Sequence, residues 1–141
     1  MIKLKMTDWT IAKDITPPIR LGYSGENNAV VIKIEIDKDE VFDFADTKYY
    51  LDIMDVVDGE KVVSRTQEME VVQETLEDES VKYTLQMRPT ACWLGKHNLK
   101  YLQIRCEYTD DTDAENPTQV VIKSNTFKGI VKYGLRNNPC D

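Results

Sequence analysis

The feature that most constrains the fold is an alternating run of apolar and polar residues that follows a turn-rich segment. Residues 20–29 contain Gly22, Gly25 and paired asparagines, which are residue types that favour tight turns. Every second position of the following stretch is apolar: Val30, Ile32, Ile34 and Ile36. A period of two places these side chains on one face of a half-buried β-strand.

The same period recurs along the chain. It predicts further strands whose inward faces hold the following residues: Tyr49, Leu51 and Ile53; Val81, Tyr83, Leu85 and Met87; Leu102, Ile104, Cys106 and Tyr108; Val120 and Ile122; Phe127 and Val131. Asp58-Gly59, between two valine pairs, predicts a tight hairpin because a type I′ turn needs positive φ at both central positions. Helical periodicity is scarce, and only one short turn within 89–97 is predicted.

Together these patterns predict an all-β domain, an Ig-like two-sheet antiparallel β-sandwich of about seven to nine strands. The prolines of Thr16-Pro17-Pro18 divide an N-terminal arm, residues 1–18, from the sandwich, residues 19–141. We expect one contiguous core made of the alternating apolar positions: Val30, Ile32, Ile34, Leu51, Ile53, Tyr83, Leu85, Leu102, Ile104 and Phe127.

Charge and cysteine content narrow the classes of partner and compartment. The 141 residues include 25 acidic and 18 basic ones, a net charge of −7, which disfavours nucleic acids and anionic membranes as partners. No stretch approaches membrane-spanning length. Three cysteines, Cys92, Cys106 and Cys140, are an odd number and fit a reducing compartment. Cys106 lies on an inward strand face and is interpreted as a small core residue.

Candidate chemistry is sparse. Cys92 and the single histidine, His97, could form a nucleophile and a base, but their segment is better interpreted as a loop, and a zinc site would need all three cysteines to converge. The carboxylates of Asp111, Asp113 and Glu115 resemble the start of a calcium loop, although Asn116 and Ile122 replace the glycine and glutamate that such a loop requires. A solvated acidic loop is the favoured interpretation. We therefore expect no enzyme activity and no cofactor.

Aromatic residues provide a second binding hypothesis. Tyr133 and four other aromatic side chains fall outside the predicted inward faces, and these four are the candidates for an exposed binding surface: Tyr23, Tyr50, Trp93 and Tyr101. Aromatic faces can stack on sugar rings, and tyrosine adds a hydrogen-bonding group. This pattern keeps a carbohydrate-binding module of a surface adhesin as the alternative function.

A resemblance to a known family gives a more specific expectation. The turn Gly25-Glu26-Asn27-Asn28, the strand that follows it and the stretch Ser124–Val131 resemble β-sandwich modules in virion proteins of tailed phages of Gram-positive bacteria. They are similar to the N-terminal domains of upper-baseplate and related tail proteins. The resemblance implies a non-enzymatic structural module that attaches to other virion proteins, as a homo-oligomer or in a hetero-assembly. It also implies a location in the virion after assembly in the bacterial cytoplasm.

Overall fold

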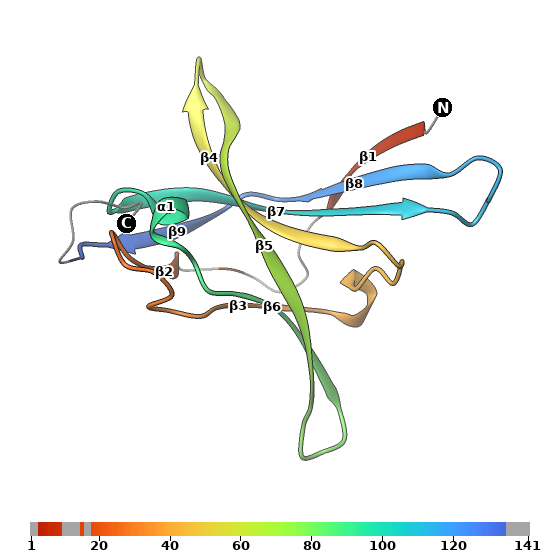
Figure 1. Cartoon of the computed structure of the whole chain (residues 1–141). Helices are drawn as coiled ribbons and strands as arrows, with labels where there is room; N and C mark the ends of the chain where they lie inside the picture. Colours follow the sequence, from red (N-terminus) through yellow and green to blue (C-terminus); the bar gives the residue numbers. More distant parts are fainter. Residues whose placement is uncertain (1–2, 10–14, 16–17, 135–141) are drawn as a thin grey trace.

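The computed structural model describes residues 3–9, 15 and 18–134, and these form an all-β structure (Figure 1). The prediction of an all-β chain is confirmed. The elements in chain order are β1 (Lys3–Trp9), β2 (Ile19–Tyr23), β3 (Ile32–Ile36), the 3-10 turn η1 (Lys38–Glu40), β4 (Lys48–Val57), β5 (Glu60–Thr75), β6 (Val81–Met87), α1 (Ala91–Leu94), β7 (Asn98–Asp110), β8 (Thr118–Ser124) and β9 (Phe127–Lys132).

Hydrogen bonding joins the strands into one mixed, nearly barrel-like sheet. The order is β1-β8-β7-β4-β5-β6-β3, with β9 also paired to β7 and β2 paired to β9. The β1–β8 and β2–β9 pairs are parallel, and the remaining pairs are antiparallel. A purely antiparallel sandwich of two separate sheets is therefore not confirmed.

The long strand β5 connects two parts of the sheet, which we call its layers. One layer contains β4 and β7 with the strands paired to them, and the other contains β6 and β3. The first part of β5 pairs with β4 as far as Met69, and its second part pairs with β6 from Glu70 onward. Residues 60–88 contain neither glycine nor proline, so nothing in the sequence interrupts the ladder where a sandwich would need a loop. One continuous strand consequently belongs to both layers.

The core lies between these layers and largely follows the predicted faces. Ile34 in β3 pairs in register with Leu85 in β6, and both belong to the same buried cluster as Leu51 and Ile104 from the other layer. Six further predicted core residues behave as expected: Ile32, Ile53, Leu102, Phe127 and Cys106 lie in the buried cluster, and Tyr83 packs against it partly buried. Val30 precedes β3 and is only half-buried. Val81, which was predicted on an inward face, begins β6 and is 41% exposed.

Local signals were reliable where turn chemistry is specific. Asp58 and Gly59 have φ of 51° and 81°, which is the positive pair that a type I′ hairpin turn requires. The predicted helical turn is α1, and the hydroxyl of Thr90 accepts a hydrogen bond from the Trp93 amide at 3.3 Å at its N-terminus. The 3-10 turn η1 follows β3 and contains two acidic residues, Asp39 and Glu40. There the Asp37 amide donates to a Glu40 carboxylate oxygen at 2.9 Å.

Candidate interaction surfaces

The hairpin formed by β4 and β5 extends beyond the sheet that supports it (Figure 1). Strand β7 pairs with β4 only as far as Met54, which lies opposite Tyr101. Within the described part of the chain, residues 55–63 pair with no strand outside the β4–β5 hairpin. We call this free two-stranded ribbon the β4–β5 arm.

The β4–β5 arm carries apolar side chains on both faces. Its four exposed valines are Val56, Val57, Val62 and Val63, and Val56 is 56% exposed. Val57 lies opposite Glu60 and Val56 lies opposite Lys61, so adjacent valines point to opposite faces of the ribbon. Exposed apolar side chains that gather on one projecting element are typical of an interaction site.

A buried ion pair on the outward side of the sheet fixes the base of the arm. Asp52 in β4 is fully buried and accepts a hydrogen bond from Arg105 Nε in β7 at 3.0 Å. The Thr66 hydroxyl in β5 donates to the same carboxylate at 2.7 Å. Although burial favours the neutral guanidine, the hydrogen bond and charge of Asp52 hold the pKa of Arg105 above its usual value. Three strands are thereby linked where the arm begins.

A second set of contacts holds β5 from its other side. The Gln67 amide donates to the Arg88 carbonyl at 2.7 Å and its oxygen accepts from the Thr90 amide at 3.2 Å. Arg65 Nη1 donates to the Cys92 carbonyl at 3.2 Å. These bonds tie β5 to the segment around α1. The base of the arm is therefore held on both sides, while among the described residues no further strand pairs with residues 55–63.

Two of the predicted aromatic binding residues are not available as open platforms. Trp93 is buried, and its Nε1 donates to the Leu51 carbonyl at 3.2 Å. The Arg105 guanidinium lies over the Tyr50 ring at 4.4 Å from the centroid. The Trp93 ring is part of the core, and the Tyr50 ring is covered by the guanidinium that pairs with Asp52.

The other two aromatic residues lie on the outward face of the sheet near β9. Tyr23 ends β2 beside Lys132, and its hydroxyl accepts a 3.4 Å hydrogen bond from Arg20. Tyr101 in β7 lies beside Lys128, and Lys61 Nζ lies 5.1 Å from its ring centroid. Each of these rings is partly exposed and has a cation beside it. The structure does not gather all four predicted residues into one site.

The acidic loop uses its carboxylates to close its own turns. Asp110 accepts hydrogen bonds from the amide and hydroxyl of Thr112, and Asp113 accepts from the Glu115 amide and the Asn116 side chain. Asp111, Asp113 and Glu115 are exposed. Among the described residues, no group of three or more histidine, cysteine or acidic side chains is arranged to hold a metal ion.

The Cys92 and His97 pair does not offer a nucleophile. Cys92 is disulfide-bonded, so its sulfur is not available as a thiolate. The odd number of cysteines predicts a reducing compartment, and this disulfide does not support that expectation. His97 packs edge-on against the Tyr133 ring with 5.2 Å between the centroids.

Cys106 is expected to be chemically inert in the folded protein. It is a fully buried free thiol, and burial raises its pKa to about 12, so the reactive thiolate is scarce at neutral pH. Alkylation followed by mass spectrometry should find Cys106 unmodified in the native protein and modified in urea. Equal labelling in both conditions would contradict its burial.

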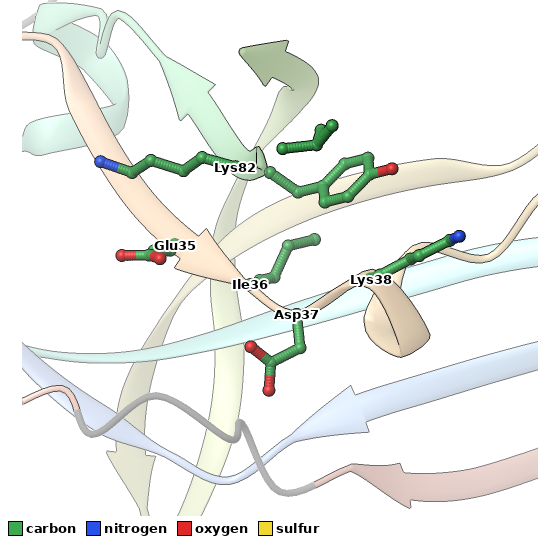
Figure 2. A pocket seen from close by; sticks show the side chains of 7 residues that line it. Glu35, Ile36, Asp37, Lys38 and Lys82 are labelled. Carbon is green, nitrogen blue, oxygen red and sulfur yellow. The ribbon is translucent and has the colours of Figure 1, made fainter. Parts of the chain in front are cut away.

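Among the described pockets, the one at the end of β3 has a volume of about 390 Å³ (Figure 2). Its lining residues are Glu35, Ile36, Asp37, Lys38, Val81, Lys82 and Tyr83. Figure 2 shows Asp37 and Lys38 directed away from each other, and Lys82 extending on the far side from Lys38. The charged groups that line this pocket are of both signs.

The valine doublets on either side of the Asp58-Gly59 turn are the sequence signal for the arm. Val56-Val57 and Val62-Val63 are doublets, and a doublet puts one valine on each face of a strand. Such a ribbon is either covered on both sides or exposed on both. The sequence pattern does not decide whether the ribbon is covered or exposed, because this depends on where β7 stops pairing with β4, which is a feature of the tertiary structure.

Comparison with protein-family models, with curated proteins and with solved structures gives no match to this chain. In the described part of the chain, no helix has both the length and the apolar character to cross a bilayer. The surfaces themselves therefore carry the functional argument.

Proposed function

We propose that this chain is a non-enzymatic structural module of a phage virion, in the baseplate, tail or head, that attaches to other virion proteins. The observation that carries the proposal is the β4–β5 arm, which presents valines on both faces and projects from a fixed base. The resemblance of the Gly25–Asn28 turn and of Ser124–Val131 to phage tail modules supplies the class of partner.

The arm is suited to insertion into a partner. Burial of apolar area is worth about 25 cal/mol per Å², and a ribbon with apolar side chains on both faces gains from contact on each side. Among the described residues, no strand pairs with the outer edges of residues 55–57 or 60–63. Free edges can accept a strand from another chain. Both features favour a partner that encloses the arm.

The proposal extends to fold family and location. The strand pattern predicts an Ig-like sandwich and the resemblance implies a β-sandwich module, and the two layers that share β5 are compatible with a variant of this class. Assembly in the bacterial cytoplasm and a final place in the virion follow from the same resemblance. The carbohydrate-binding alternative has less support, because the buried ring of Trp93 cannot stack on a sugar.

The test uses the arm and the proteins encoded beside this one. A tagged chain is co-expressed with the products of the flanking genes, and we expect one of them to co-purify in fixed stoichiometry. The double variant Val56→Ser with Val62→Ser removes one valine from each face and should weaken this binding at least about tenfold.

The matched control is Lys33→Ser with Glu70→Ser, two exposed polar positions on the other layer, which should bind as the unmodified chain does. Circular dichroism checks that both variants fold. Equal binding by the arm variant and the control, or no binding partner among the flanking products, would refute the proposal.

A further inference from the structure

The outward face of β2, β9 and β7 combines basic and apolar side chains. Leu99 in β7 pairs in register with Ile130 in β9, and both are exposed, Leu99 by 46%. Arg20 lies beside Ile130 on β2, and Lys128 and Lys132 flank it along β9. The burial pattern of β9 directs these three β9 side chains outward. We call this set of five residues the basic face.

The positive charge of the basic face is opposite to the net charge of the protein. The whole protein carries a net charge of −7, yet the charged residues of the basic face are all cations. Lys61, over the neighbouring Tyr101 ring, extends the positive region toward the arm. An exposed apolar pair ringed by cations is complementary to an acidic surface that also carries apolar side chains.

The chain itself presents such a surface at the end of the β5–β6 hairpin. Its apolar side chains, Leu76 and Val81, are exposed. Its exposed carboxylates are Glu74, Glu77, Asp78 and Glu79. Hydrogen bonds from the hydroxyl and amide of Ser80 lower the pKa of Asp78, so this carboxylate stays ionised. We call these six residues the acidic tip.

The acidic tip and the basic face of one molecule cannot meet. Figure 1 shows the β5–β6 hairpin projecting away from β2 and β9. The two surfaces are also different patches, so their union between molecules is heterologous and leaves a free tip and a free face at the two ends. When each copy docks on a different neighbour, repeated contacts of this kind build a ring or a filament.

We infer that the chain self-associates head to tail, with the acidic tip of one copy docked on the basic face of the next. The occupant of the basic face is thus a second copy of this chain. Leu76 and Val81 would cover Leu99 and Ile130, and the carboxylates around them would face Arg20, Lys128 and Lys132. This contact uses neither face of the β4–β5 arm, so it stands apart from binding to another virion protein.

Two charge-reversal variants test the inference on the full chain. The tip variant is Glu74→Lys with Glu77→Lys, and the face variant is Lys128→Glu with Lys132→Glu. All four positions are exposed, and circular dichroism with thermal melts confirms folding. Size-exclusion chromatography with light scattering over a concentration series in low salt should show growing oligomers for the unmodified chain. Each variant alone should associate at least about tenfold more weakly.

Mixing the two variants gives the decisive result. The tip variant keeps a native face and the face variant keeps a native tip, and the two reversed surfaces are again opposite in charge, so the mixture should associate although neither variant does so alone. High salt should weaken this association, because the contact is partly electrostatic. The inference is overturned if the unmodified chain stays monomeric, if either variant alone associates normally, or if the mixture does not associate. Binding of the basic face to anionic vesicles by a monomeric chain would likewise overturn it.

The outcome is separable from that of the proposed function. Arm variants should lose the flanking partner and keep self-association, whereas tip and face variants should do the reverse. A chain that binds its flanking partner but never self-associates would refute only the head-to-tail contact.

Discussion

The variant Ile34→Ala is expected to lower the free energy of unfolding by about 2–5 kcal/mol. Ile34 is 3% exposed and faces Leu85 across the β3–β6 ladder. Truncation removes buried methyl groups and leaves a cavity, because neighbouring strands hold the surrounding side chains in place. Urea melts of the variant and the unmodified chain measure the difference.

Lys33 provides the matched control one position earlier on the same strand. Its side chain points outward and is exposed, so Lys33→Ala should change the free energy of unfolding by no more than about 0.5 kcal/mol. A one-residue shift in register would exchange the two results, because every side chain would change faces. Equal urea midpoints, or the larger loss at Lys33, would therefore show that β3 is assigned wrongly.

The strands and most of the core were predictable because their signals are local. Alternation in β3 and the positive-φ preference of Asp58-Gly59 act within a few residues, and both predictions are confirmed. The continuity of β5 and the parallel β1–β8 pairing are long-range outcomes of which strands become neighbours. The alternation of apolar and polar residues marks a strand, but it does not specify which other strand pairs with it.

The interaction surfaces were harder to predict for a related reason. Trp93 was interpreted as exposed from its place in a loop, yet α1 folds that loop over the core and buries the ring. The valine doublets were recognised, but their exposure depends on where β7 stops pairing with β4. Arg20 and Ile130 are 110 positions apart in sequence and become neighbours only through the parallel β2–β9 pair.

The ion pair at the base of the arm should be the most sensitive polar contact among those described. Arg105→Leu leaves the carboxylate of Asp52, which is fully buried, without its cation. Removing one partner of a buried pair costs about 3–5 kcal/mol, because the remaining charge stays desolvated. Urea melts should show this loss. The control is Lys48→Ala, which breaks a 3.1 Å pair with Glu68 whose side chains are both more than half exposed, and which should cost about 0–1 kcal/mol.

A variant that removes both charges distinguishes the stability contributed by the ion pair from the destabilisation caused by leaving one buried charge without a partner. Asp52→Leu combined with Arg105→Leu should be more stable than Arg105→Leu alone, since two apolar side chains leave no unpaired buried charge. If the double variant lost as much stability as the two single losses added together, the carboxylate and the guanidinium would be acting independently. That result would contradict the 3.0 Å contact between them and the role of this contact in fixing the arm.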